Sequence, residues 1–271
     1  MPTLFIVPTP IGNLEDITLR ALRVLKDSAL IAAEDTRTSR VLLNHYDINT
    51  PMTSYHEHNK LDKLDAMLSA LAGGDVALIS DAGTPGISDP GYELIRAAID
   101  AGYRVEPLPG ANAIIPALVA SGLPADRFMY VGFIPKKAKA RAAFLHDLAD
   151  QRGTIIAYES PHRLVDTLDA IAQVMGAARA VCVAREISKA FEEFRRGTCA
   201  EVRDYYAANP PRGEITVLID GATPDSAPWS PERVREALRQ RLEGGESRRD
   251  AARAIAGLAG WSKREVYALD V

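Results

Sequence analysis

The sequence has few of the features that mark an extracellular or membrane protein. Its 271 residues include only two cysteines, Cys182 and Cys199, which lie far apart in the chain. This number and spacing predict neither a disulfide framework nor a metal site, as is typical of a reducing compartment. No stretch approaches the roughly 20 apolar residues of a membrane-spanning helix, and residues 1–7 lack the basic start and apolar length of a signal peptide. We therefore expect a cytoplasmic protein that binds no metal and no membrane.

Two common nucleotide-binding motifs are also missing. The glycine-rich loop 80–91 has no lysine and does not match Gly-x-x-x-x-Gly-Lys-[Ser/Thr], so nucleoside triphosphate hydrolysis is not expected. The loop 8–13 is not Gly-x-Gly-x-x-Gly, which argues against a dinucleotide site because a pyrophosphate needs that close approach. The net charge of −4 argues against a general nucleic-acid coat but allows a local basic patch.

The residues that are present have the balance of a globular protein, with 47% hydrophobic and 25% charged. Short β-rich runs alternate with longer helical patterns, which predicts an α/β fold with largely parallel sheets. The predicted strands are residues 4–7, 30–33, 76–80, 104–108, 128–131, 154–158, 180–184 and 214–219. The predicted helices of this part are residues 19–27, 60–72, 91–101, 111–121, 138–149 and 163–175.

The pattern predicts three domains along the chain. An N-terminal α/β domain covers residues 1–121, and a second α/β domain covers residues 122–221. Residues 221–229, rich in proline and small residues, are expected to form a linker. Residues 230–271 carry only helical patterns, with capping serines before each helix and a glycine-containing turn. We therefore expect a small, all-helical, helix-turn-helix-like C-terminal module.

Two loops at strand-to-helix junctions are candidate ligand sites. Loop 80–91 holds three glycines and two prolines between a strand and a helix, and loop 107–113 occupies an equivalent position. Such loops at the carboxyl ends of parallel strands are where α/β folds bind ligands, and free N–H groups at a helix start favour a carboxylate. The alternative is a tight turn without a ligand. Asp89-Pro90 predicts a capped helix start within the first loop.

Six runs of the sequence, spread over nearly the whole chain, resemble the ribosomal RNA small subunit methyltransferase I family, a branch of the tetrapyrrole methylase superfamily. They are residues 6–13, 33–37, 80–91, 106–110, 158–163 and 184–189. The resemblance implies two α/β domains of the tetrapyrrole methylase (class III methyltransferase) type, with S-adenosylmethionine between them. It also implies a homodimer that methylates the ribose 2′-hydroxyl of a decoding-centre cytidine of 16S ribosomal RNA in the small ribosomal subunit.

The candidate cofactor residues come from these loops and runs. They are Pro10, Gly12, Asp81, Ala82, Gly83, Thr84, Pro85, Gly86, Ser88, Pro109, Gly110, Ala111, Glu159, Glu186 and Gly213. One loop departs from the superfamily, because tetrapyrrole methylases usually carry Gly-x-Gly-Pro-Gly where this chain has residues 8–13. Whether Pro10 and Gly12 contact the cofactor or the substrate therefore stays open.

Methyl transfer to a ribose hydroxyl needs a general base that removes the hydroxyl proton, or a cation that stabilises the alkoxide. The candidate catalytic residues are Asp35, Arg37 and Lys189, which follow predicted strands. A helix cap with a surface ion pair is the equal alternative for Asp35 and Arg37, and Lys189 has the alternative of a surface lysine. The general base is not assigned.

A short basic segment, residues 135–141, is the candidate RNA-binding site. Its cations are Lys136, Lys137, Lys139 and Arg141, with no acidic residue between them. The alternative is a solvated loop and helix start. Two other functions stay open for the chain: a methyltransferase that acts on a corrin precursor, and a non-catalytic RNA-binding protein.

Overall fold

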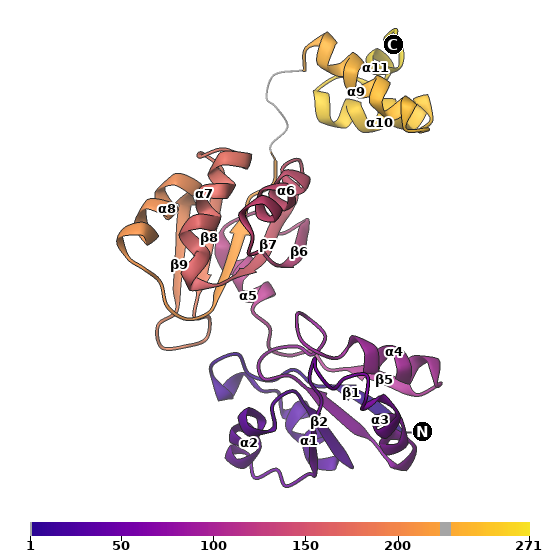
Figure 1. Cartoon of the computed structure of the whole chain (residues 1–271), viewed down its shortest axis with the longest axis vertical. Coiled ribbons are helices and arrows are strands. Elements are labelled where there is room, and N and C mark those ends of the chain that lie inside the picture. The colour runs from indigo at the N-terminus through magenta and orange to yellow at the C-terminus, as the bar shows by residue number, and fades with distance from the viewer. Residues whose placement is uncertain (1, 223–228) are drawn as a thin grey trace. The chain divides into compact units, whose positions relative to one another are not determined.

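The computed structural model describes residues 2–222 and 229–271. The chain forms two compact units, the first reaching to Asp220 and the second extending from Gly221 to Val271. The first unit contains two five-stranded sheets, each with helices on both faces (Figure 1). The predicted α/β class is confirmed. Within the described ranges, no helix is long and apolar enough to cross a membrane.

The first sheet has the strand order β3-β2-β4-β1-β5, and all its pairs are parallel. Its strands are β1 (Thr3–Ile6), β2 (Leu30–Ala33), β3 (Met52–Ser54), β4 (Val76–Ile79) and β5 (Arg104–Pro107). All four residues of β4 are buried, as expected for a central parallel strand covered on both faces. The carboxyl ends of these strands therefore meet at one edge, where the ligand loops begin.

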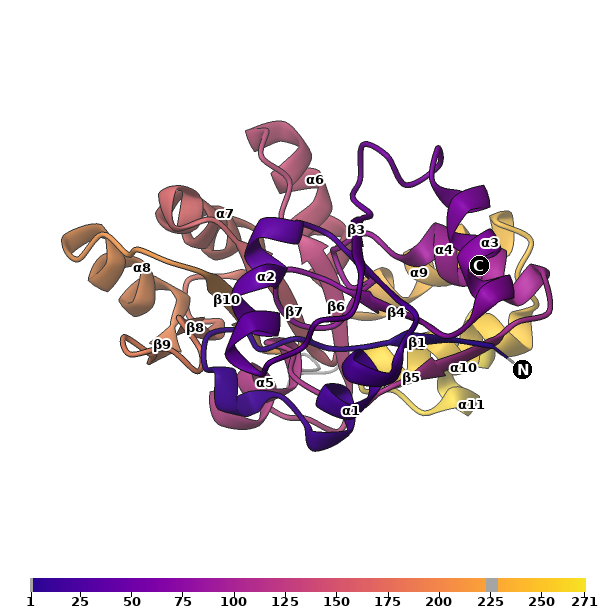
Figure 2. The ribbon, with the colours of Figure 1, turned by 90° about the horizontal axis from the view of Figure 1, so that it is seen from below.

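Four helices cover the two faces of this sheet. Two of them, α1 (Leu19–Asp27) and α2 (Thr36–His45), contribute to the core on one face. The opposite face packs against α3 (Leu64–Gly73) and α4 (Tyr92–Asp100). These two helices contact each other and lie side by side (Figure 2).

The second sheet has the order β6-β7-β10-β8-β9, and only β6 and β7 pair in parallel. Its strands are β6 (Phe128–Phe133), β7 (Thr154–Glu159), β8 (Ala180–Arg185), β9 (Glu193–Thr198) and β10 (Ile215–Ile219). The prediction of largely parallel sheets is wrong here. The loop 186–192 between β8 and β9 is shorter than the roughly dozen residues that a parallel crossover needs.

The helices of the second sheet come from both sides of the expected domain boundary at residue 121. One face packs against α6 (Ala138–Leu148), α7 (Leu164–Met175) and α8 (Cys199–Ala208). The other face packs against α5 (Ile114–Ser121), whose buried residues contact apolar side chains of β7, β8 and β10. Thus α5 precedes residue 122 in sequence but contributes to the core of the second sheet.

The C-terminal unit is a small helical bundle with its own core. Its helices are α9 (Pro231–Glu243), α10 (Arg248–Ala259) and α11 (Lys263–Tyr267). The predicted capping serines are Ser230, Ser247 and Ser262. The side chain of each accepts a hydrogen bond from a backbone N–H in the first turn of its helix. Trp229 and Trp261 pack against the core, and the Trp261 indole donates to the Trp229 carbonyl at 2.9 Å. Most of the expected linker, residues 223–228, lies outside the described residues.

Four elements of the first unit were not predicted: β3, β9, α2 and α8. Strand β3 has only three residues. Strand β9 carries two exposed arginines, so its sequence lacks the apolar pattern that predicts a strand. The predicted cap at Asp89 is wrong, because α4 begins at Tyr92 with Gly91 as its N-cap and with no side-chain cap. The alternative interpretation of Asp35, as a helix cap, is confirmed. Its side chain accepts a hydrogen bond from Arg37 N at the start of α2.

Candidate functional site

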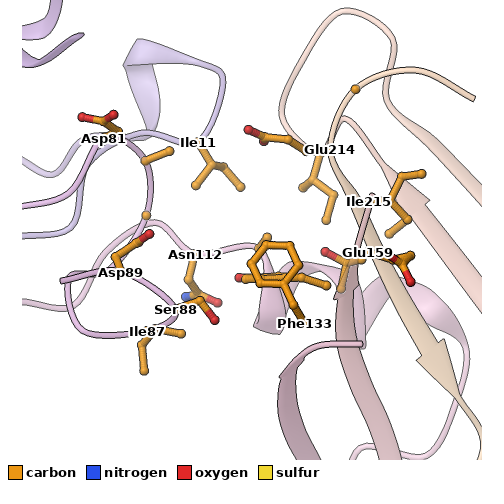
Figure 3. Close-up of a pocket in the computed structure, with 18 of the residues that line it drawn as sticks. Ile11, Asp81, Ile87, Ser88, Asp89, Asn112, Phe133, Glu159, Glu214 and Ile215 are labelled. Carbon is orange, nitrogen blue, oxygen red and sulfur yellow. The ribbon is translucent and has the colours of Figure 1, made fainter. Parts of the chain in front are cut away.

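A cavity of about 440 Å³ lies at the carboxyl edge of the first sheet, where loops from both sheets of the first unit meet (Figure 3). From the first sheet it is lined by the loop after β4 and by Asn112 and Ala113 after β5. From the second sheet it is lined by the ends of β6 and β7 and by the start of β10. We call this space the first cavity.

Backbone hydrogen bonds hold the loop after β4 against the loop after β1. Thr9 and Gly83 exchange two such bonds, each of 2.9 Å, and the Thr9 hydroxyl donates to the Ser80 carbonyl at 3.0 Å. The Thr84 hydroxyl donates to the Ala111 carbonyl at 3.1 Å, which joins the loop after β5. Gly83 has a φ of +84°, a conformation that favours glycine. The glycine-rich loop is therefore a fixed wall of the cavity.

Three contacts connect the loops of the two sheets around this cavity. The hydroxyls of Ser88 and Tyr130 lie 2.6 Å apart, and Ser188 donates to Asp16. Gly12 lies so close to Lys189 that a Cβ at position 12 would overlap its side chain. The absence of a side chain at position 12 thus lets Lys189 approach the first sheet.

The lining of the first cavity is acidic. Five acidic side chains line it, those of Glu34, Asp81, Asp89, Glu159 and Glu214, while none of its lining residues is Lys, Arg or His. Asp81 and Asp89 lie on one side and Glu214 on the other (Figure 3). Burial and the charges of Glu34, Asp81 and Glu214 raise the pKa of Asp89 to about 7, and burial also raises the pKa values of Glu34 and Asp81. A cleft with charge of one sign attracts ligands of the opposite charge, so this one favours a cation.

Glu159 lines the cavity, but its carboxylate is already engaged. The Ser160 amide donates to one oxygen and the Thr167 hydroxyl to the other, both at 2.6 Å. Arg163 adds an ion pair, and the Glu159 side chain is fully buried. These bonds hold the end of β7 in place beside the cavity.

The structure brings together about half of the candidate cofactor residues. Those that line the first cavity are Asp81, Ala82, Gly83, Thr84, Ser88, Glu159 and Gly213. Those that do not line it are Pro10, Gly12, Pro85, Gly86, Pro109, Gly110, Ala111 and Glu186. Several of the second group support lining residues, as Ala111 does by accepting from Thr84.

The candidate catalytic residues lie beside the cavity and do not line it. Asp35 pairs with Arg37 at 2.6 Å, which lowers the pKa of Asp35 to about 2, and the Arg37 side chain is 89% exposed. The Asp35 amide donates to the Asp81 carboxylate at 3.0 Å, which connects this pair to the cavity wall. The Lys189 ammonium lies 2.8 Å from Glu186 and 3.0 Å from the lining carboxylate Glu214.

Sequence reasoning missed several lining residues. Asp89 is among them, because before a proline it resembles a helix cap, whereas Glu34 lies at a strand end where polar residues are expected to line the cleft. Tyr158 lies at the end of a predicted strand and Phe133 beyond the end of another, where no local pattern marks them as ligand-facing. Glu214 stood inside a predicted strand, although the strand begins at Ile215.

The basic segment, residues 135–141, divides into two parts. Lys136, Lys137 and Lys139 are exposed and available to solvent. Arg141 is only 8% exposed, and its Nε has no hydrogen-bond partner among the described residues. The four cations therefore do not form one continuous surface.

Comparisons with known proteins agree with this architecture. The sequence model of the family described as Tetrapyrrole (Corrin/Porphyrin) Methylases matches residues 3–203. A protein named ribosomal RNA small subunit methyltransferase I from Synechocystis is 45% identical over 100% of this chain and 98% of its own length. Its namesake from Pseudomonas aeruginosa is 51% identical over 81% of this chain and 79% of its own.

Solved structures show the same fold at lower identity. A cobalt precorrin-4 methyltransferase superimposes with a TM-score of 0.60 at 18% identity, covering 80% of this chain and 94% of its own. Uroporphyrin-III C-methyltransferase from Thermus thermophilus gives 0.57 at 19% identity, with the same coverage. The chain belongs to the tetrapyrrole methylase family and, within it, to the ribosomal RNA small subunit methyltransferase I family.

Proposed function

We propose that this chain uses S-adenosylmethionine to methylate the ribose 2′-hydroxyl of a decoding-centre cytidine of 16S ribosomal RNA. The observation that carries the proposal is the acidic cavity at the carboxyl edge of a parallel sheet, in a chain whose relatives bear the name of a ribosomal RNA methyltransferase. The proposal places the chain in the cytoplasm, as a homodimer that acts on the small ribosomal subunit.

The lining of the first cavity fits the charge of this cofactor. S-adenosylmethionine carries a sulfonium, an ammonium and one carboxylate, and is therefore a net cation. Carboxylates of Glu34, Asp81 and Asp89 line the space and form no ion pair within the described residues, whereas Glu214 is paired with Lys189. When bound, the cofactor supplies a methyl group that is already electrophilic.

Other residues of the cavity suit the remaining parts of the cofactor. Apolar side chains of Ile11, Ile87, Phe133 and Ile215 offer contacts for an adenine ring. The N–H and C=O of Gly83 are paired with Thr9, so we assign the polar tail to backbone groups of its neighbours Ala82 and Thr84, which also line the cavity. Alignment of two reactants in such a site supplies up to about 7–11 kcal/mol of a barrier.

The chemistry on the acceptor side requires proton removal and charge stabilisation. We assign Asp35, Arg37 and Lys189 to turnover and not to cofactor affinity. Lys189 is placed beside Glu214 to stabilise a developing alkoxide or to bind a phosphate, and the exposed Arg37 guanidinium suits a phosphate. Alanine at each position should lower the rate of methyl transfer and leave cofactor affinity nearly unchanged.

The homodimer is supported by exposed apolar side chains on α5. Ile115 and Val119, four residues apart and therefore on the same side of this helix, are 44% and 71% exposed. Exposed apolar patches of this kind commonly mark association surfaces. Sedimentation of the full chain, compared with a Val119→Glu variant, tests this part of the proposal separately.

The experiment that tests the activity uses labelled S-adenosylmethionine with small ribosomal subunits, naked 16S ribosomal RNA or a corrin precursor. We expect label at one ribose 2′-oxygen of a decoding-centre cytidine. Label on a corrin precursor and none on RNA would instead establish the tetrapyrrole alternative. Calorimetry that detects no binding of S-adenosylmethionine would favour the non-catalytic RNA-binding protein.

A matched pair of glycine variants controls for the fold. Gly83 and Gly102 have similar φ values of +84° and +78°, so valine strains the backbone similarly at both. Gly83 lines the first cavity, whereas an added Cβ at Gly102 meets nothing within 4 Å. Gly83→Val should lose cofactor binding and Gly102→Val should keep it. Equal binding by both variants would show that the cofactor lies elsewhere.

A further inference from the structure

A second cavity, of about 410 Å³, opens beside the first on the second sheet. It lies between the β8–β9 loop, α8 and the segment 209–213. Gly213 lines both cavities, and Glu214, the next residue, lines the first. A polymer whose reacting unit occupies the first cavity can therefore extend into the second. None of the functions assigned above uses this space.

Aromatic side chains form much of the second cavity. Phe191, on the loop 186–192, is 72% exposed, although it is a large apolar side chain. The Tyr205 and Tyr206 rings meet edge to face with centroids 5.0 Å apart. Tyr206 is 1% exposed, and its hydroxyl has no hydrogen-bond partner among the described residues. The exposed ring of Phe191 offers a flat apolar surface that suits a planar ligand.

Around the second cavity the acidic side chains are paired, whereas some of the basic side chains are not. Glu193 bonds to Arg185 at 3.0 Å and to the Tyr205 hydroxyl at 2.9 Å, and Glu186 is paired with Lys189. The exposed Arg212 guanidinium, in contrast, has no side-chain partner within the described part of the chain.

Arg195 also lies next to this cavity, with its guanidinium stacked 3.9 Å above the Tyr205 ring. Within residues 2–222 and 229–271 this arginine forms no ion pair. The face around the second cavity therefore presents two arginines that can donate to phosphates, Arg195 and Arg212.

We propose that the second cavity binds an unpaired nucleobase of the RNA strand, adjacent to the nucleotide that enters the first cavity, with Arg195 and Arg212 on the flanking phosphates. The proposal rests on the proposed function and names a further subsite of it. Proteins recognise single-stranded RNA by stacking splayed bases on aromatic rings and by placing cations along the backbone. Phe191 is the exposed ring available for this stacking.

The test measures binding of a short single-stranded RNA to the full chain by fluorescence anisotropy. Phe191→Ala should weaken binding about 5- to 150-fold, the usual effect of losing one base stack. Phe191→Trp should retain the affinity, and Phe191→Leu should not, because leucine is apolar but offers no flat ring. Tyr92→Ala is the control, since Tyr92 is an aromatic residue of α4 that is 69% exposed.

The phosphate contact has a separate readout. Arg212→Gln should reduce the slope of log K against log salt by about 0.7, the value for one contact with a single strand. Arg96→Gln, on α4 and paired with Asp100, should leave the slope unchanged. An RNA with one abasic nucleotide should bind wild type and Phe191→Ala equally.

Wild-type affinity in Phe191→Ala would overturn the base-binding site, and so would equal affinity of Phe191→Leu and Phe191→Trp. This test of the RNA subsite can fail or succeed independently of the test of the proposed methyltransferase activity. If ribosomal RNA receives no methyl group while Phe191→Ala still loses RNA binding, the subsite stands and the activity fails. If methyl transfer occurs with the same KM for RNA in wild type and Phe191→Ala, the activity stands and the subsite fails.

Discussion

Replacing Asp89 by asparagine should separate the charge of the first cavity from its shape. Burial of the Asp89 carboxylate, together with the charges of Glu34, Asp81 and Glu214, raises its pKa from the ordinary 3.8 to about 7. Asparagine has nearly the same size and resembles the protonated form. The variant therefore removes one negative charge at pH 8 and almost none at pH 5.

The direction in which pH changes the free energy of unfolding follows from proton binding. Between about pH 4 and pH 7 the native state holds a proton on Asp89 that the unfolded chain has lost, so the wild-type free energy of unfolding falls as pH rises. The full difference in pKa corresponds to at most about 4 kcal/mol. Because the carboxylate is partly exposed, solvent screening reduces this, and we expect Asp89→Asn to be more stable than wild type by about 1–2 kcal/mol at pH 8.

Cofactor binding should have the opposite pH dependence. A bound cation favours the ionised form of Asp89, so below pH 7 wild type should release a proton when it binds S-adenosylmethionine, and its affinity should rise from pH 6 to pH 8. Asp89→Asn should show a flatter dependence in this range. Calorimetry in two buffers of different ionisation enthalpy measures the proton, and thermal melts from pH 5 to pH 8 measure the stability. Parallel pH curves for wild type and variant, in either measurement, would refute the reasoning.

Three further predictions concern other parts of the chain. Glu159→Ala should lower the free energy of unfolding by about 3–5 kcal/mol in denaturant titrations, because it leaves Arg163 without its buried partner; a loss below 1 kcal/mol would contradict this. Replacing Lys136, Lys137 and Lys139 together by glutamine should weaken RNA binding and reduce its salt slope by up to about 2, whereas glutamine at the buried arginine of the basic segment should lower the melting temperature. A chain without the C-terminal unit, which has its own core, should fold and bind S-adenosylmethionine but methylate ribosomal substrate poorly; simultaneous loss of cofactor binding would show a stabilising role instead.

Much of the local structure could be predicted because its causes are local. The strand at Leu30–Ala33 and the helix at Leu19–Asp27 match their predicted bounds, since apolar runs and periodic patterns depend on neighbouring residues alone. The serine caps of the C-terminal helices follow for the same reason, as each needs only the backbone N–H three residues ahead. The glycine-rich loop is likewise a candidate ligand site from its composition and its place after a strand, and the structure shows that several of its residues line the first cavity.

The candidate site was less predictable where a residue's role depends on distant neighbours. Asp89 stands before a proline and locally resembles a helix cap, but its pKa is raised by burial and by the charges of Glu34, Asp81 and Glu214, of which Glu34 and Glu214 come from distant segments. Arg141 continues a run of lysines in sequence, but the helical turn directs it into the protein while Lys139 faces solvent. The pKa of a carboxyl group and the burial of an arginine both depend on which surfaces pack against each other in the folded chain.

The sequence by itself determined the family of this protein, the class of its fold, most of its strands and helices, and the loop that forms one wall of the first cavity. These follow from short-range patterns and from long matching runs. Only the tertiary structure decided that α5 packs on the second sheet, that this sheet is mostly antiparallel, and that five acidic side chains share one cavity. The physical reason is that strand pairing, helix packing and electrostatic coupling join residues far apart in the chain, and no local pattern records which of them will meet.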